Sequence, residues 1–231
     1  MFNVTLIGTF HSESGICNSD ELYKILENIK PEVIFHELPT HLSEFCYSEK
    51  FDIVYNNKHT QKQVIALMPL EMKCIKRYKQ NYDIIIAPID IDTILKNEEI
   101  NYMLEAFSND ENYINIENEQ KALIEQEGFH FLNSNKYLEL EKKKELIEKD
   151  ILESDKHKDS LQIIYKRFQT EQHDKRENAM IQNIYNYSRG NPYKQAVFLV
   201  GVGHLKTIMT KIDEYQTSSK IQLNWTMYNN E

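Results

Sequence analysis

Apolar residues in this chain form four short continuous runs, each bounded by polar residues or glycine, and this pattern predicts buried strands. The runs lie within Phe2–Gly8, Glu32–Glu37, Tyr82–Asp90 and Gln195–Gly201. Continuous rather than alternating apolarity is typical of a sheet that helices cover on both faces. A fifth segment, Lys220–Tyr228, alternates more and is expected to be an edge strand.

Helical periodicity occupies the stretches between these strands. Asn18 or Ser19 is expected to cap a helix whose apolar stripe runs to Ile29. Further helices are predicted near Gln61–Asn81 and over roughly Leu205–Tyr215. The first strand, helix and strand have the spacing of a βαβ unit, for which a right-handed crossover is expected.

The middle of the chain, about residues 94–187, has a different composition. It is rich in Glu, Lys, Asn and Gln, contains Gly128 as its single glycine, and places leucines and isoleucines at helical spacing over Lys136–Asp155. We interpret it as a helical insertion packed over one side of the sheet. The predicted architecture is therefore a single α/β domain over residues 1–231, with a mixed, largely parallel central sheet covered by helices and a long helical insertion before the last βα unit.

Composition restricts the classes of function. Among 231 residues, 41% are hydrophobic and the net charge is −9, which suits a protein with a real core and argues against a general nucleic-acid binder. No apolar run is long enough for a membrane span, and the amino end lacks the features of a signal peptide, so a cytoplasmic location is expected. Three cysteines without C-x-x-C spacing argue against a disulfide framework or a thiolate zinc site.

Two phrases near opposite ends of the chain share one pattern. Gly8-Thr9-Phe10-His11 and Gly201-Val202-Gly203-His204 each follow an apolar strand and have the spacing G-x-x-H. Ligands of parallel α/β sheets bind beyond the carboxyl ends of the strands. We therefore expect His11 and His204 to contribute to one site.

Other polar residues also follow predicted strands. Alternation along a strand places His36 and Glu37 on opposite faces, and Glu37, closer to the strand's end, is the better candidate for the site. Asp90 ends the third strand, where an orienting, metal-binding or helix-capping role is open. Arg176 and Asn178, two positions apart, have the chemistry to hold a carbonyl or carboxylate group.

Two histidines and a carboxylate are compatible with two kinds of chemistry. They form a ligand set for a divalent metal such as zinc or manganese, with positions left open for water. They are equally a set for metal-free acid–base catalysis, in which a carboxylate orients a histidine base. The residues alone do not decide between these alternatives.

Five short motifs together resemble the TraB/GumN/TIKI family, which is related to erythromycin-esterase and ChaN-like proteins. They agree with the family in order and rough spacing, and cover most of the chain outside the helical middle. The motifs are Gly8-Thr9-Phe10-His11, Glu37-Leu38 after an apolar strand, Ala87-Pro88-Ile89-Asp90, Arg176-Glu177-Asn178-Ala179-Met180 and Val200-Gly201-Val202-Gly203-His204-Leu205.

The resemblance implies a sheet-end active site and one of several activities. In TIKI-like members, the two G-x-x-H histidines and the glutamate support a peptidase activity that depends on manganese or cobalt. Esterase relatives use the matching histidine as a base without metal, and ChaN-like relatives bind haem or iron. This chain is shorter than many TIKI-like members and has its own acidic middle, which leaves the substrate open.

The first hypothesis is a hydrolase that depends on a divalent metal (Mn, Co or Zn) and acts on a peptide, or on a small ester or amide. His11, Glu37 and His204 would hold the metal, Arg176 and Asn178 would bind the substrate carbonyl, and Asp90 would orient a ligand. The alternatives are a metal-free esterase with His11 as base and Glu37 as its partner, or a non-catalytic binding protein. The insertion is a possible homodimer surface.

Overall fold

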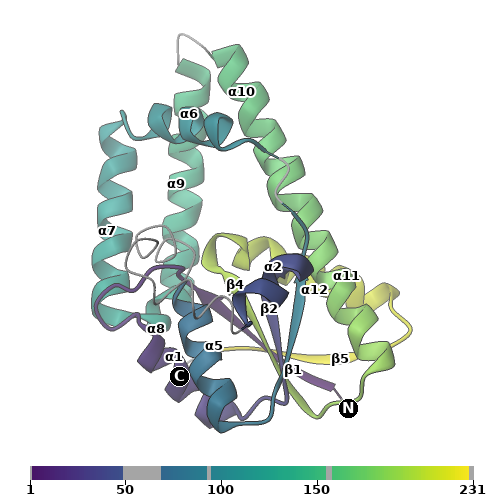
Figure 1. Ribbon diagram of the computed structural model, residues 1–231. Coiled ribbons are helices and arrows are strands. Elements are labelled where there is room, and N and C mark those ends of the chain that lie inside the picture. Colours follow the sequence, from purple (N-terminus) through teal and green to yellow (C-terminus); the bar gives the residue numbers. More distant parts are fainter. Residues whose placement is uncertain (1, 49–68, 93–94, 155–157, 229–231) are drawn as a thin grey trace.

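The central sheet has five strands in the order β3-β2-β4-β1-β5, and every described pairing is parallel (Figure 1). The computed structural model describes residues 2–48, 69–92, 95–154 and 158–228. The strands are β1 (Phe2–Thr9), β2 (Val33–Pro39), β3 (Ile85–Asp90), β4 (Gln195–Gly201) and β5 (Leu223–Met227). The predicted α/β class is confirmed, and the edge strand is parallel like the rest.

The register brings the ends of neighbouring strands level with one another. Thr9 at the end of β1 pairs with Gly201 at the end of β4. On the other side of β4, Leu199 pairs with His36 of β2. The turns that follow β1, β2 and β4 therefore leave the same edge of the sheet, as the predicted site requires.

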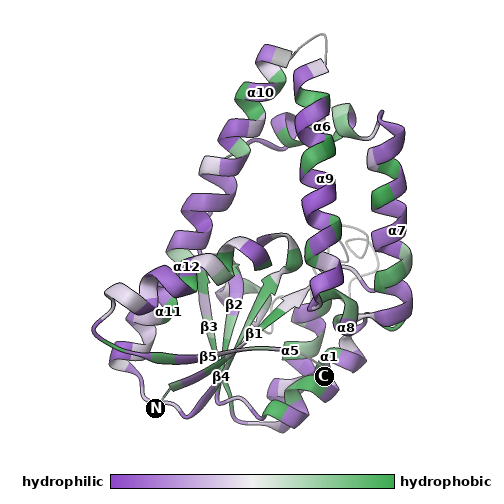
Figure 2. Cartoon of the chain, turned by 180° about the vertical axis from the view of Figure 1, so that it is seen from behind, coloured by the Kyte–Doolittle hydropathy of each residue, from purple (hydrophilic) through white to green (hydrophobic). Residues whose placement is uncertain are grey.

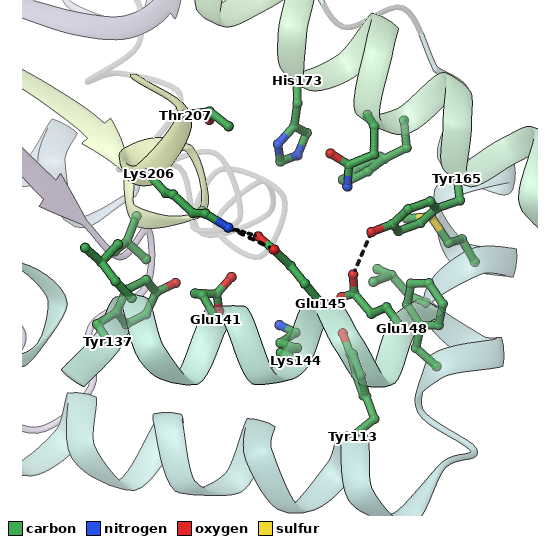
Figure 3. A pocket seen from close by; sticks show the side chains of 18 residues that line it. Tyr113, Tyr137, Glu141, Lys144, Glu145, Glu148, Tyr165, His173, Lys206 and Thr207 are labelled. Carbon is green, nitrogen blue, oxygen red and sulfur yellow. Dashed lines mark hydrogen bonds and ion pairs between the residues drawn. The ribbon is translucent and has the colours of Figure 1, made fainter. Parts of the chain in front are cut away.

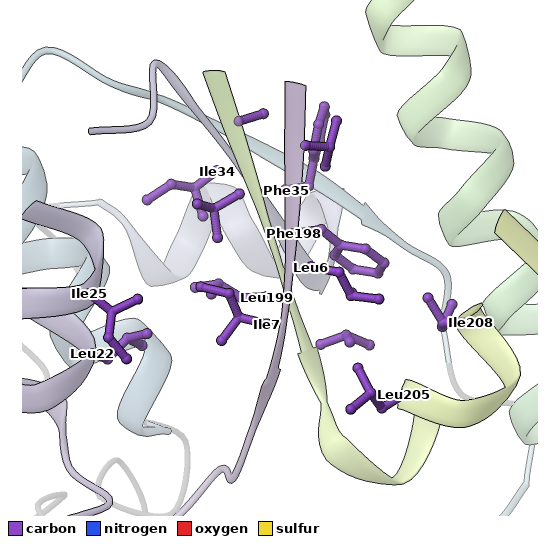
Figure 4. Packing of buried hydrophobic residues seen from close by; sticks show 14 of the residues in the cluster. Leu6, Ile7, Leu22, Ile25, Ile34, Phe35, Phe198, Leu199, Leu205 and Ile208 are labelled. Carbon is purple, nitrogen blue, oxygen red and sulfur yellow. The ribbon is translucent and has the colours of Figure 1, made fainter. Parts of the chain in front are cut away.

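Helices cover the sheet on both faces because its central strands are apolar on both faces. Figure 4 shows Ile7, Ile34 and Leu199 directed toward α1, while Leu6, Phe35 and Phe198 point the other way, toward α12. All six side chains are buried. This two-sided burial is what the continuous apolar runs of a covered parallel sheet predict.

The helices on the sheet faces follow the predicted βα pattern. The first begins where expected, because the side chain of Asn18 accepts hydrogen bonds from the backbone N–H groups of Asp20 and Glu21. Residues 61–68, where we expected the second helix to begin, lie outside the described residues. The elements are α1 (Ser19–Ile29), α2 (Thr40–Cys46), α5 (Leu70–Asn81), the 3-10 turn η2 (Val202–His204) and α12 (Leu205–Ser218).

The insertion is helical, as predicted, but most of it does not lie over one side of the sheet. Its last helix packs along β3 and α12 and its short helix α8 (Phe129–Leu132) packs against β1, while the other helices rise beyond the carboxyl ends of the strands (Figures 1 and 2). Its elements are α6 (Asn97–Phe107), α7 (Glu111–Glu127), α8 (Phe129–Leu132), α9 (Asn135–Ser154), α10 (Lys158–Arg167), the π-helical segment η1 (Phe168–Asp174) and α11 (Lys175–Gly190).

The projecting helices α6, α7, α9 and α10 form an arm with a small core of its own. Met103, Phe107, Leu152 and Leu161 are buried together there, apart from the core that surrounds the sheet. This second core explains why the insertion was wrongly expected to pack over the sheet. Apolar residues at helical spacing can be buried equally well against other helices. Within the described residues, no helix has the length and apolarity to cross a membrane.

Candidate active site

The candidate site lies at the point where connections leave the sheet on opposite faces. The chain after β1 enters α1 on one face, whereas the chain after the neighbouring β4 enters α12 on the other. Such a switch point leaves a crevice at the carboxyl ends of the strands, where α/β proteins bind ligands. His11, Glu37 and His204 follow or end the three adjacent strands β1, β2 and β4.

His11 is oriented by a buried glutamate that the sequence did not suggest. Its Nδ1 donates to Oε1 of Glu71 at 3.0 Å, and the Thr9 hydroxyl donates to the same oxygen. The backbone N–H of Leu70, at the start of α5, donates to the carbonyl of His11 at 2.9 Å. The hydrogen bond to Glu71 outweighs burial and raises the pKa of His11 to about 9.

His204 lies between two carboxylates. Its Nδ1 donates to Oε1 of Glu177 at 2.8 Å, and its Nε2 lies 3.4 Å from Oε1 of Glu37. Burial alone would lower the pKa of His204, but the hydrogen bonds to Glu177 and Glu37 outweigh it and raise this pKa to about 9. Each G-x-x-H histidine thus has a buried glutamate behind Nδ1, as histidine ligands of metals commonly do.

Glu37 is buried, and both of its oxygens already have donors. Oε1 accepts from Nη2 of Arg176 at 2.8 Å, and Oε2 accepts from the backbone N–H of Gly201 at 2.6 Å. Burial alone would raise the pKa of Glu37, but the positive charges of His204, His11 and Arg176 hold it well below its usual range. His36 Nδ1 lies 3.0 Å from the Tyr47 hydroxyl, and His36 lines a small cavity together with His11 and Glu37.

Asp90 and Arg176 form a buried ion pair. Nε of Arg176 lies 3.1 and 3.2 Å from the two carboxylate oxygens of Asp90, and its Nη2 donates to Asp90 as well as to Glu37. Asp90 therefore orients an arginine and not a histidine. Arg176 balances two buried carboxylates, so the sequence-based role of contacting substrate does not match the contacts that it makes.

Asn178 is placed away from these residues. Its side-chain amide donates to the carbonyl of Asp174, four positions earlier in the same helical run, at 2.8 Å. Amide side chains on helices commonly bond backward in this way when they do not face a partner. The structure thus brings His11, Glu37, Asp90, Arg176 and His204 together, and leaves Asn178 outside that cluster.

A small cavity lies between His11 and Glu37. It has a volume of about 40 Å³, enough for one or two water molecules. Gly201 forms part of its wall, and a β-carbon there would lie 2.9 Å from Nε2 of His11 and 3.2 Å from Oε2 of Glu37. Glycine at 201 therefore leaves room for the free nitrogen of His11 to face the cavity.

A second group of ligand-type residues adjoins His204, and reasoning from the sequence missed it. His173, Glu177 and His204 each offer an atom within 4.8 Å of those of the other two. Nδ1 of His173 lies 3.7 Å from Oε1 of Glu177, and its ring packs between those of Phe168 and His204. The spacing His173-x-x-x-Glu177, which places two residues on one helix face, is the signal that was available.

These distances correct the predicted metal-ligand set. Of the described residues, only His173, Glu177 and His204 form a group close enough to share one ion. His204 is the one predicted ligand that belongs to it. The physical reason is that Arg176 and the Gly201 N–H occupy the oxygens of Glu37, while Glu71 holds His11 on the far side of the cavity.

A larger chamber lies between the arm and the turn after β4. It has a volume of about 230 Å³, and its walls come from α6, α7, α9, η1 and the β4–α12 turn. Figure 3 shows His173 directed into it and Thr207 beside it. Both residues contact Glu177, at 3.7 Å and 2.7 Å. His173 therefore reaches the chamber, and Glu177 and His204 lie one layer of side chains behind it.

Comparison of the chain with protein-family models, with curated proteins and with solved structures found no match.

Proposed function

We propose that the protein is a hydrolase of amide or ester bonds whose activity depends on a divalent metal. The observation that carries this proposal is the pairing of both G-x-x-H histidines with buried glutamates, His11 with Glu71 and His204 with Glu177. In each pair the second ring nitrogen is directed toward Glu37 or the cavity beside it. Histidines held in this way serve as metal ligands or as oriented acid–base groups.

The chain's own groups suit an acid–base role at a carbonyl carbon. His11 is the more accessible of the two histidines, with 59% of its side chain exposed, whereas His204 is 9% exposed. His11 would move a proton through Nε2 at the cavity, while Glu71 holds its other nitrogen. A bound divalent metal would supply Lewis acidity that stabilises the negative charge developing on the substrate oxygen.

The predicted ligands fit such a metal only in part. The two imidazoles are suitable donors, but Glu37 would have to give up Arg176 or the Gly201 N–H to bind it. This favours one alternative, a metal-free hydrolase in which His11 is the base. Its orienting partner would then be Glu71, because Nδ1 of His11 bonds to Glu71 and not to Glu37.

The test is hydrolysis of a panel of p-nitrophenyl esters and aminoacyl p-nitroanilides by chelator-treated protein, with and without added Zn²⁺, Mn²⁺ or Co²⁺. We expect metal-dependent turnover that falls about 10²–10⁴-fold in His11→Ala and is also lost in His204→Ala. The matched control is His130→Ala, because His130 is an exposed histidine near Glu127 on the insertion. Activity unchanged by chelation would support the metal-free alternative. If His11→Ala and His204→Ala both retained the activity of the parent protein, hydrolysis at this site would be refuted.

A further inference from the structure

The position of His204 raises the question of which side of its ring a metal would occupy. Glu37 lies at Nε2 and Glu177 lies at Nδ1. Whichever nitrogen binds the metal, the carboxylate at the other nitrogen becomes the group that orients the ring. The surroundings of the two carboxylates therefore decide between the two sides.

On the Glu37 side the carboxylate is saturated. It accepts from the guanidinium of Arg176 and from the Gly201 N–H, so its charge is already balanced. A cation placed there would lie next to another cation. Repulsion between like charges in a buried setting opposes metal binding on that side.

On the Glu177 side the carboxylate has a free oxygen. The side chain of Glu177 is 1% exposed, and its Oε2 has no hydrogen-bond partner among the described residues. A buried, unpaired carboxylate oxygen is costly unless something binds it. A second imidazole, that of His173, lies on this side, 3.7 Å from the other oxygen of Glu177.

The separations between these donors suit a small divalent cation. Ligands held at 2.0–2.2 Å in tetrahedral geometry lie about 3.3–3.6 Å apart. The observed distances to Oε1 of Glu177, 2.8 Å from Nδ1 of His204 and 3.7 Å from Nδ1 of His173, lie on either side of that range. Two imidazoles and a carboxylate form a ligand set of catalytic zinc sites, which leave a further position open.

The π-helical segment and the chamber support the same assignment. His173 lies within η1, and π-helical turns inside helices occur often at functional sites. His173 and Thr207, which both contact Glu177, line the chamber between the arm and the sheet. A ligand that fills the chamber would approach an ion bound to His173 from the arm side.

We propose that His173, Glu177 and His204 bind one divalent cation of the zinc type, on the chamber side of His204 and not between the two G-x-x-H histidines. On binding, the proton on Nδ1 of His204 leaves to solvent, and Nε2–H remains to donate to Glu37. This inference deepens the proposed function, since it names the ligands of the same site.

The experiment measures metal binding and needs no substrate. Chelator-treated protein is titrated with Zn²⁺ by calorimetry, and with Co²⁺ while the visible absorption of the bound ion is recorded. We expect one equivalent to bind, with affinity at least 100-fold lower in His173→Ala and Glu177→Gln. We expect His11→Ala and the surface control His130→Ala to bind within threefold of the parent protein.

Each contrary outcome overturns the assignment. Full Zn²⁺ affinity in both His173→Ala and Glu177→Gln would place the ion elsewhere, and loss of binding in His11→Ala with retention in His173→Ala would place it between the G-x-x-H histidines. Absence of Zn²⁺ binding by the parent protein would also refute the assignment of these ligands. Hydrolysis without metal would refute only the metal dependence of the proposed activity. Circular dichroism checks folding, and His173→Gln replaces His173→Ala if the alanine variant is unfolded.

Discussion

The side chain of Asn133 pairs with both backbone groups of Gly8 near the end of β1. The Gly8 N–H donates to Oδ1 of Asn133 at 2.7 Å, and Nδ2 of Asn133 donates to the Gly8 carbonyl at 3.0 Å. Two residues earlier, the carbonyl of Leu6 accepts from the N–H of Tyr228, just after β5 ends. Because alternate residues of a strand bond toward the same neighbour, Asn133 bonds on the side of β1 that faces β5.

Replacement of Asn133 by leucine is expected to lower the free energy of unfolding by about 2–4 kcal/mol, because it leaves two buried backbone groups of Gly8 without partners. Urea denaturation measures the change. Asn109→Leu is the matched control, since Asn109 is exposed, lies in the turn after α6, and its side chain bonds only to the carbonyl of Glu105 among the described residues. Equal stability of the two variants would contradict the role given to Asn133.

The pKa of His11 should depend on Glu71. In chelator-treated protein, NMR should show His11 charged up to a pKa of about 9, raised from 6.5 mainly by its hydrogen bond to Glu71. The other titratable groups that influence it are Glu37, which raises this pKa, and His204, which lowers it. In Glu71→Gln the pKa should fall by more than one unit, because the negative charge that accepts the hydrogen bond of His11 is removed.

The same pair predicts how stability varies with pH. A histidine whose pKa is higher in the folded state stabilises the fold fully below its unfolded pKa of 6.5, and this contribution is lost as the pH rises through about 9. The stability difference between the parent protein and Glu71→Gln should therefore be larger at pH 6 than at pH 9.5. A constant difference across this range would show that Glu71 does not raise the pKa of His11.

Gly201→Ala should impair catalysis more than folding. The backbone at 201, with φ −53° and ψ 131°, is open to alanine, but the new β-carbon would displace the ring of His11 from 2.9 Å. A shift of about 1 Å in an acid–base group lowers kcat by about 100-fold, while stability should change by less than about 1 kcal/mol. Gly203→Ala is the control, since a β-carbon there meets no described atom within 4 Å.

Arg176→Met should be strongly destabilising, because Glu37 and Asp90 would remain buried without their common partner. Loss of one member of a buried ion pair costs about 3–5 kcal/mol. Thermal and urea unfolding give the measured value. Arg189→Met, which alters an exposed arginine on the same helix, should change stability by no more than about 0.5 kcal/mol.

The strands, and the position of their carboxyl ends at one edge of the sheet, were predictable. Continuous apolar runs followed by glycine indicate buried strands directly. His11, Glu37 and His204 come from residues next to strands, so parallel pairing alone brings them to one edge. Glu71 was not predictable in this way. It lies at the start of α5, and its place beside His11 depends on how that helix docks against the turn after β1.

Arg176 has contacts that the sequence did not indicate, for an electrostatic reason. A guanidinium next to predicted site residues suggests substrate binding, but two buried carboxylates, Glu37 and Asp90, needed a counter-charge. The number of buried charges cannot be counted before the strands are placed. His173 was not predicted because it lies in a helical segment and not at the end of a strand. Its four-residue spacing from Glu177 was visible in the sequence.

The place of β1 in the sheet has a consequence for biosynthesis. β1 lies between β4 and β5, both of which follow it by more than 180 residues in the chain. Until residue 195 has been made, the backbone N–H and C=O groups along both edges of residues 2–9 have neither of their partner strands. His11 can therefore meet His204 only after residue 204 has been made. A chain stopped after the arm would contain both members of the His11–Glu71 pair, but neither member of the His204–Glu177 pair, and so no complete site.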